Sequence, residues 1–248
     1  MTRFAVLSDI HSNLWALDAV LADARKKQVD QLINLGDILY GPLAPKATYE
    51  RLQCETIITI KGNQDRQIYE ATAADITANP TLQFILEDLG QEPLHWMRKL
   101  PPTLTLAEDI FLCHGAPDND LIYLLEEVAA GYPRIRPDAD ICEQVPSITT
   151  SLILCGHTHI PRAIQLSTGQ LVVNPGSVGL PAYHDDLPVP HAMENHSPHA
   201  TYCIVERTAA GWTTAFVKVP YDYQKAIDAA HARGRKDWAF ALSTGRAP

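Results

Sequence analysis

The chain has 248 residues, of which 46% are hydrophobic, and a formal net charge of −9 at neutral pH; this length and apolar content suit a single α/β domain. The negative charge argues against binding to a nucleic-acid backbone, because such binding requires a basic surface that displaces counterions. The sequence contains no run of about 18 apolar residues, so we expect no membrane-spanning segment.

The cysteines indicate the compartment. There are five, scattered along the chain without a C-x-x-C pair, which is typical of buried thiols in a reducing environment. The first residues also lack a signal peptide, because Asp9 and His11 interrupt the only early apolar segment. We therefore expect a cytoplasmic protein.

The first half of the chain predicts alternating strands and helices. Three apolar runs without alternation predict strands that are covered on both faces: residues 3–8, 31–36 and 55–60. An amphipathic helix over residues 14–27 lies between the first two, which favours a right-handed connection between parallel strands. Residues 66–106 are expected to form a helical insertion, with its clearest helices at 81–89 and 92–100.

The second half predicts further strands at residues 109–113, 151–155, 162–166, 171–173, 201–207 and 212–220. We expect a helix at 121–130 and a loop rich in His and Pro at 183–200. Residues 222–248 are expected to form a helix followed by a frayed tail. Because no linker divides the sequence, we expect one domain over residues 1–248.

Five of the predicted strands end in side chains that bind metals. The seven donors are Asp9, His11, Asp37, Asn63, His114, His157 and His159. Strand ends are where open α/β sheets place their ligands. Carboxylate, imidazole and amide donors suit manganese, iron, zinc or cobalt, and seven donors are too many for one ion. We therefore predict two metal ions that share a carboxylate, as in two-metal hydrolytic sites.

Each of these residues, taken singly, also has an ordinary structural explanation. Asp37 follows Gly36 and could simply begin a turn, and a single His at a strand end is commonly a structural residue. The two pairs Asp9-x-His11 and His157-x-His159 favour a site, because alternate residues of an extended segment face the same side.

Together these motifs resemble the signature of calcineurin-like metallophosphoesterases: Asp9-x-His11, Gly36-Asp37, Gly62-Asn63-x-Asp65, His114 and Gly156-His157-x-His159. The Asn-Pro-Gly-Ser sequence at residues 174–177 resembles the compact bacterial branch, which includes YfcE-like and diadenosine tetraphosphatase-like enzymes. The resemblance implies an α/β (α+β) fold in which two mixed β-sheets pack as a sandwich flanked by helices.

The resemblance also implies a ligand set. One metal would be held by Asp9, His11, Asp37 and His159, and the other by Asp37, Asn63, His114 and His157, with Asp37 as the bridge. Manganese is the expected metal, with iron, zinc, cobalt and nickel as alternatives. A hydroxide between the ions would attack a small soluble phosphate ester, either a phosphodiester or a nucleotide-type anhydride.

Position 64 departs from the family pattern, since many members carry a His there that protonates the leaving group. This chain has Gln64, whose amide can hydrogen-bond a phosphate oxygen but cannot act as an acid. We therefore predict low activity on simple alkyl esters. Asp65 would orient such a His and is otherwise expected to cap a helix that starts near Arg66. Arg66 itself is either a phosphate contact or a solvated surface residue.

Other functions stay open at this stage. The protein could be a phosphomonoesterase or protein phosphatase, or a noncatalytic metal-binding scaffold of the same fold. The scaffold hypothesis draws on the loss of His at position 64, whereas the retention of all seven donors argues for catalysis. The stretch 183–200 is interpreted as a solvated loop, with the alternative that it reaches the site and shapes substrate choice. The sequence leaves the oligomeric state open.

Overall fold

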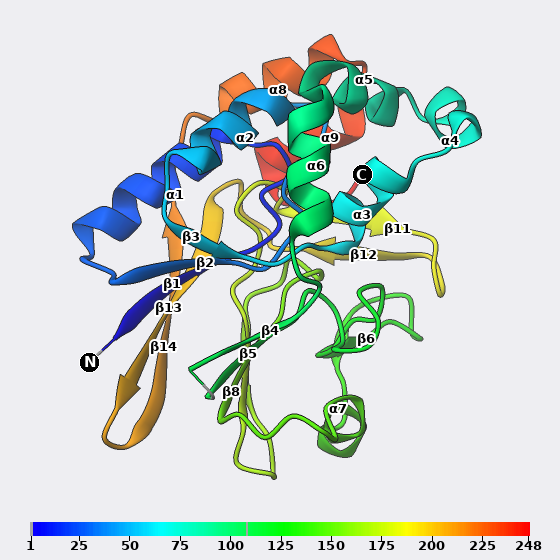
Figure 1. Ribbon diagram of the computed structural model, residues 1–248. Helices are drawn as coiled ribbons and strands as arrows, with labels where there is room; N and C mark the ends of the chain where they lie inside the picture. The colour runs from blue at the N-terminus through cyan, green and yellow to red at the C-terminus, as the bar shows by residue number, and fades with distance from the viewer. Residues whose placement is uncertain (1, 108) are drawn as a thin grey trace.

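A computed structural model describes residues 2–107 and 109–248, and two five-stranded sheets form its centre (Figure 1). The first sheet has the order β14-β13-β1-β2-β3. Its strands are β1 (Arg3–Leu7), β2 (Gln31–Asn34), β3 (Ile57–Thr59), β13 (Ala200–Thr208) and β14 (Gly211–Val219). The first three strands are parallel, and β13 and β14 join them as an antiparallel hairpin. The predicted parallel connection from β1 to β2 is therefore confirmed.

The second sheet repeats this plan of three parallel strands with antiparallel neighbours. Its order is β4-β5-β8-β10-β9. The strands are β4 (Leu104–Leu106), β5 (Ile110–Leu112), β8 (Leu152–Leu154), β9 (Arg162–Gln165) and β10 (Leu171–Asn174). Strands β5, β8 and β10 are parallel, whereas β4 and β9 lie antiparallel at the edges. Both sheets are mixed, which confirms the predicted fold class.

The two sheets share an apolar core. It contains Val6, Ile33, Leu35, Ile60, Ile110, Leu112, Leu152, Leu154, Val173, Cys203 and Val205. These side chains come from strands of both sheets, so their burial holds the two layers together. The opposite faces of the strands are covered as well, which explains why the sequence of each central strand is apolar without alternation.

Nine helices lie among the described residues. They are α1 (Leu14–Lys26), α2 (Pro45–Gln53), α3 (Asn63–Glu70), α4 (Ala73–Ala78), α5 (Pro80–Leu89), α6 (Gln91–Lys99), α7 (Asp138–Gln144), α8 (Tyr223–Ala232) and α9 (Lys236–Thr244). Figure 1 shows α1 and α2 above the first sheet. The side chain of Asn13 caps α1 by accepting a hydrogen bond from the main-chain N–H of Ala16 at 3.1 Å.

The prediction of a helix at residues 121–130 is wrong. The stretch forms turns and the short strand β6 (Glu126–Glu127), which pairs with β7 (Arg134–Ile135). Its apolar run is buried in the outer core of the second sheet, and periodicity cannot distinguish such a run from a helix. Main-chain carbonyls that a helix would use internally accept hydrogen bonds from Arg136 instead.

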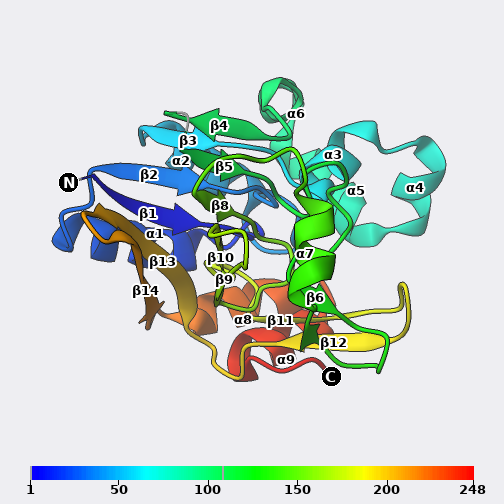
Figure 2. The same cartoon turned by 90° about the horizontal axis from the view of Figure 1, so that it is seen from below.

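Two predictions for the C-terminal part are also corrected. The stretch 183–200 contains a hairpin of β11 (Ala182–Asp185) and β12 (His191–Glu194), and the expected frayed tail contains α9. Figure 2 shows this hairpin beside α8 and α9. Trp238 and Leu242 of α9 are buried in one cluster with Ala182, so tertiary packing orders both segments.

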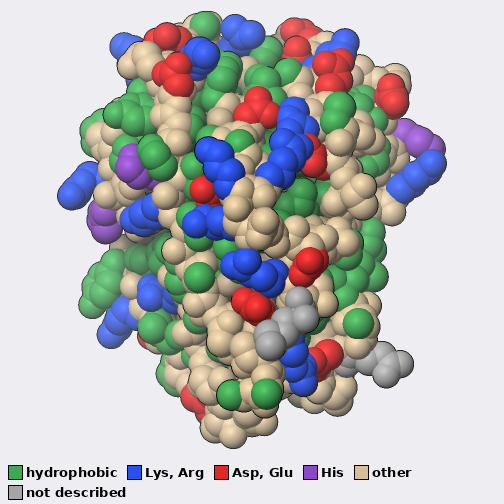
Figure 3. All heavy atoms as spheres, turned by 90° about the vertical axis from the view of Figure 1, so that its left-hand side faces the viewer, with side chains coloured by type: hydrophobic (Ala, Val, Ile, Leu, Met, Phe, Trp, Pro, Cys, Tyr) green, Lys and Arg blue, Asp and Glu red, His purple; other side chains and the backbone are tan. Residues whose placement is uncertain are grey.

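The surface on the side of β1 and β14 is mixed in charge. Figure 3 shows Lys and Arg side chains interspersed with Asp and Glu on this face. Ion pairs on these elements include Arg3–Glu206 at 3.4 Å and Lys27–Asp23 at 4.0 Å. Within residues 2–107 and 109–248, every helix is too short or too polar to cross a membrane.

Candidate metal centre

The main chain turns sharply directly after the strands, at the residues that carry the predicted metal-binding side chains. Asp9, His11, Asp37, His157 and His159 all have positive φ angles, between 48° and 73°. A residue other than glycine in this left-handed region costs roughly 1–2 kcal/mol, and such strain is concentrated at functional sites. We predicted that the two donors in Asp9-x-His11 and in His157-x-His159 face the same side because alternate residues of an extended segment do so. That reason is wrong, because neither segment is extended.

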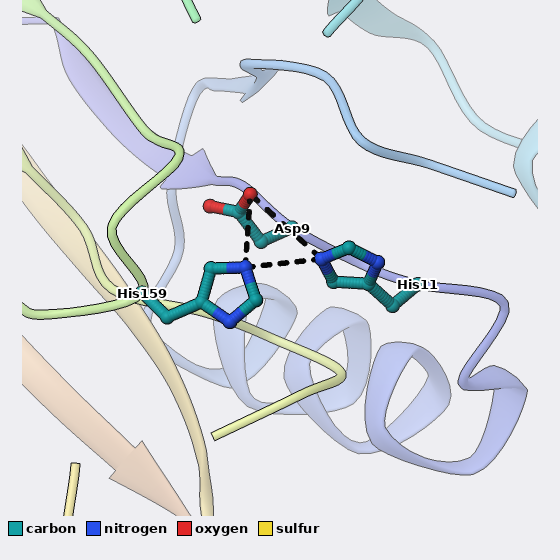
Figure 4. A group of neighbouring side chains, drawn as sticks. All are labelled: Asp9, His11 and His159. Atoms are coloured by element: carbon teal, nitrogen blue, oxygen red, sulfur yellow. Dashed lines mark hydrogen bonds and ion pairs between the residues drawn. The ribbon is translucent and has the colours of Figure 1, made fainter. Parts of the chain in front are cut away.

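The first group of ligands comprises Asp9, His11 and His159 (Figure 4). His11 Nε2 lies 3.0 Å from His159 Nε2, and Asp9 Oδ1 lies 3.4 Å from His159 Nε2 and 4.0 Å from His11 Nε2. All three side chains are buried. Two segments that are 148 residues apart in the sequence thus bring one carboxylate and two imidazoles to a single point.

The second group comprises Asp37, His114 and His157. His114 Nε2 lies 3.3 Å from Asp37 Oδ2 and 3.9 Å from Asp9 Oδ1, which belongs to the first group. The two groups are therefore neighbours. His157 and His159 are separated by one residue but belong to different groups, and both have a positive φ, so the segment between them is not extended.

Three potential metal-donor atoms of the predicted ligand set are buried without a hydrogen-bond partner in the part of the chain that the structure describes. Asp9 Oδ1, Asn63 Oδ1 and His114 Nε2 are buried and have no hydrogen-bond partner among the described residues. Buried polar atoms are nearly always paired, so three orphaned atoms on residues of the predicted ligand set require an explanation. Oxygen and imidazole nitrogen donors together match manganese, iron, zinc or cobalt, and the residues present therefore fit a metal centre.

Main-chain carbonyls fix the orientation of the imidazoles. Three of them donate Nδ1–H to a carbonyl: His11 to Tyr40 at 2.9 Å, His114 to Leu35 at 2.8 Å and His159 to Leu180 at 2.6 Å. This leaves Nε2 of each ring for a metal. His157 is the exception, because its Nε2 lies 3.3 Å from the carbonyl of Leu121 and Nδ1 is left over.

The protein environment favours neutral rings at two of these positions. Burial and the neighbouring imidazoles lower the pKa of His11 and of His157 to about 4. At His114, burial opposes the charge, but Asp37 and Asp9 raise the pKa to about 10. A metal that binds His114 must therefore displace a proton.

The sequence comparison decides the family. Residues 2–206 match the calcineurin-like phosphoesterase superfamily domain. The chain belongs to this superfamily. The predicted family is thereby confirmed, and the protein is a metal-dependent phosphoesterase, that is, a hydrolase of phosphoric esters.

The phosphoesterase resembles proteins of several organisms. It is 27% identical to the uncharacterized protein MJ0912 of Methanocaldococcus jannaschii, over 92% of this chain and 91% of that protein. It is 26% identical to the phosphodiesterase YfcE of Escherichia coli K12, over 73% of this chain and 82% of that protein. The crystal structure of a metallophosphoesterase from Sphaerobacter thermophilus has the same fold, with a TM-score of 0.76, 24% identity and coverage of 98% and 100%.

Asp65 of the phosphoesterase ties the loop of Asp37 to helix α3. Its Oδ1 accepts N–H groups of Ile38 at 2.9 Å and Leu39 at 3.4 Å, and its Oδ2 accepts that of Gly62 at 2.9 Å. Burial and the Asp37 carboxylate raise the pKa of Asp65 to about 7. The helix expected to start near residue 66 begins at residue 63 instead, so Asp65 lies within its first turn.

The two residues beside Asp65 differ in their surroundings. The main-chain N–H of Gln64 donates to Asp37 Oδ1 at 2.8 Å, and its side-chain Oε1 is buried without a partner. Arg66 forms two hydrogen bonds to Asp120, at 3.0 and 2.7 Å. The side chain of Gln64 therefore remains available to a ligand. The guanidinium of Arg66 is already paired with Asp120, which favours its interpretation as a surface residue over a phosphate contact.

The turn at residues 174–179 holds the ligand loops together. Ser177 Oγ and the N–H of Gly179 both donate to the carbonyl of Asp9, at 2.8 and 2.9 Å, and Asn174 Nδ2 donates to the carbonyl of Gly156 at 2.7 Å. A Cβ atom on Gly179 would lie 1.7 Å from the carbonyl oxygen of Ile10. The main chains pack so closely that only glycine fits at this position.

Gly179→Ala is expected to lower the free energy of unfolding by about 3 kcal/mol, because the added methyl group pushes the Asp9 loop away from the turn. Urea unfolding of the metal-free protein measures this loss. The control is Gly169→Ala, whose Cβ meets no atom within 4 Å and whose cost comes from its φ of 88° alone, about 1 kcal/mol. Equal losses in the two variants would contradict the close-packing explanation.

A cavity of about 1240 Å³ opens beside the metal centre. Its wall includes Gln64 and several of the ligands, and four aromatic side chains that no motif predicts as a set: Tyr40, Tyr123, Tyr183 and Trp238. The ring of Tyr123 lies 4.8 Å from that of His157, and the ring of Tyr183 lies 4.6 Å from that of His159. An aromatic ring thus packs against each of these two imidazoles.

The hairpin β11–β12 is anchored at this cavity by hydrogen bonds. Tyr183 donates to the main-chain carbonyl of His157 at 3.1 Å, and Tyr123 Oη lies 3.0 Å from Nε2 of His191. His191 is only 2% exposed. The solvated-loop interpretation of residues 183–200 is therefore wrong for the hairpin, which reaches the site, although His184 and His196 are exposed.

Proposed function

We propose that this phosphoesterase uses two divalent cations to hydrolyse a small soluble phosphodiester or nucleotide-type anhydride. The observation that carries this proposal is the pair of adjoining ligand groups with their orphaned buried atoms. Asp9, His11, His159 and Asp37 would hold one cation, and Asp37, Asn63, His114 and His157 the other. Manganese is the proposed metal, with iron, zinc, cobalt and nickel as alternatives.

Two bound cations would neutralise the phosphate charge and lower the pKa of a water between them to near neutrality. The chain contributes the rest of the chemistry. Asp37 and Asn63 belong to the ligand set, and Asp65 fixes the loop that carries Asp37. Gln64 lines the cavity, and its side-chain amide N–H would donate to a phosphoryl oxygen. Because an amide cannot protonate a leaving group, the site favours substrates whose leaving group departs unaided.

Two findings favour a small diester as the substrate. YfcE, one of the similar proteins, is named a phosphodiesterase. The cavity of about 1240 Å³ has room for a second ester group beside the metals. We also propose the cytoplasm as the compartment, which is supported by five free cysteine thiols.

Elemental analysis combined with an activity assay tests the proposal. The protein purified with Mn²⁺ is expected to hold about two metal ions per chain. It should hydrolyse bis(p-nitrophenyl) phosphate faster than p-nitrophenyl phosphate. One bound metal would contradict the dinuclear site, and faster monoester hydrolysis would favour a phosphomonoesterase. Intact substrates under every metal tried would favour a noncatalytic scaffold.

A further inference from the structure

Arg136 lines the same cavity as the metal ligands but belongs to none of the family motifs. Its Nη2 donates to the main-chain carbonyls of Tyr123 at 3.1 Å and Glu126 at 3.0 Å. The ring of Tyr123 in turn lies 4.8 Å from that of His157. The guanidinium of Arg136 is therefore bound to the main chain of Tyr123, whose ring packs against the predicted metal ligand His157.

The charge of Arg136 is not matched by a carboxylate. Among the described residues, no carboxylate oxygen lies within 4.0 Å of its nitrogens, and its Nε is buried without a partner. Glu126, on the same wall, is fully buried and accepts a hydrogen bond from Arg162 at 2.6 Å. The Glu126 carboxylate is thus paired with Arg162 and leaves the charge of Arg136 unpaired, so the cluster of Arg136, Glu126 and Arg162 carries a net positive charge.

Among the residues that the structure describes, the remainder of the cavity wall offers no comparable cation. Arg235 also lines it but is paired with Asp237 at 2.6 Å and donates to Thr81 at 2.6 Å. The carboxyl groups of Glu127 and Asp185 lie on the wall as well, where they repel an anion. Among the described arginines of the wall, Arg136 is therefore the one that favours a second negative charge on a ligand.

We propose that Arg136 binds a second anionic group of the substrate, beyond the phosphorus that is attacked. This inference rests on the proposed function, which places the scissile phosphate at the two ligand groups. The substrate class is a phosphate ester whose alcohol or nucleoside part carries a further phosphate or carboxylate. A guanidinium fixed by two carbonyls is preorganised for such a group, because it loses little freedom when it forms charge-assisted hydrogen bonds.

Calorimetry on the Mn²⁺-loaded protein tests this without turnover. Thymidine 3′,5′-bisphosphate is expected to bind about tenfold more tightly than thymidine 5′-phosphate. Arg136→Ala should remove this preference and leave the affinity for thymidine 5′-phosphate unchanged. The matched control is Arg134→Ala, an exposed arginine two residues away. A 3′-O-succinyl derivative of thymidine 5′-phosphate distinguishes recognition of a carboxylate from recognition of a phosphate.

Arg136→Gln serves as a second variant, because its amide keeps a donor for the two carbonyls while removing the charge. Loss of the preference in both variants, with weaker binding of the bisphosphate alone, supports the proposal. Equal affinities of the two nucleotides for the unchanged protein overturn it, as does a preference that survives in both variants. If the preference depends on Arg136 but no phosphate ester is hydrolysed, this inference stands and the proposed function fails.

Discussion

Replacing Asp37 with Asn is expected to lower kcat/KM for bis(p-nitrophenyl) phosphate about 1000-fold. Asp37 Oδ2 lies 3.3 Å from His114 Nε2, and its Oδ1 accepts the N–H of Gln64. An amide keeps the size of the side chain and one acceptor oxygen, but it removes the negative charge that would be shared between two cations. The loss should therefore appear in metal content as well as in rate.

Asp18→Asn is the matched control, because it neutralises an aspartate on α1 whose side chain is 52% exposed. The control should retain full activity and the metal content of the unchanged protein. Unfolding in urea shows whether the Asp37 variant remains folded. If that variant kept both metals and an undiminished rate, Asp37 would not be the shared ligand.

The elements that carry the ligands were predictable because their signals are local. Each of the central strands is a short apolar run that stops at a polar residue, and burial on both faces makes that pattern visible in the sequence. Parallel strands also deliver their carboxyl ends to one edge, which is why Asp9, Asp37 and His114 meet. The sharp turns at these strand ends were not predictable, because a positive φ remains uncommon at any residue other than glycine, His157 included.

The outer wall of the cavity depends on contacts between distant parts of the chain. Tyr123 lies in an apolar run whose pattern fits a helix as well as a buried turn. Its contacts to His191 and Tyr183 join residues that are 68 and 60 positions apart in the sequence. Such pairings leave no periodic pattern in a single sequence. The family motifs therefore predicted residues that the fold brings together in the two ligand groups, whereas the aromatic wall of the cavity emerged only from the fold.

Replacing Gln64 with His is expected to raise kcat/KM about 100-fold for methyl phenyl phosphate, which has a poor leaving group. The rate for methyl p-nitrophenyl phosphate should change little, because p-nitrophenolate leaves without a proton. Gln64 lines the cavity, and its Oε1 has no partner that the substitution would disrupt. The expected gain is at the low end for a general acid, since the Asp65 carboxylate already accepts main-chain N–H groups on both oxygens and is not free to turn toward the new imidazole.

The pH profile identifies the mechanism of this gain. An imidazole acid works only when protonated, so the added rate on the phenyl ester should fall as the pH rises through about 6.5. Gln67→His places the same imidazole elsewhere on the cavity wall and should give neither the gain nor the pH dependence. An equal gain on both esters, or a gain that persists at high pH, would show that position 64 does not supply the missing proton.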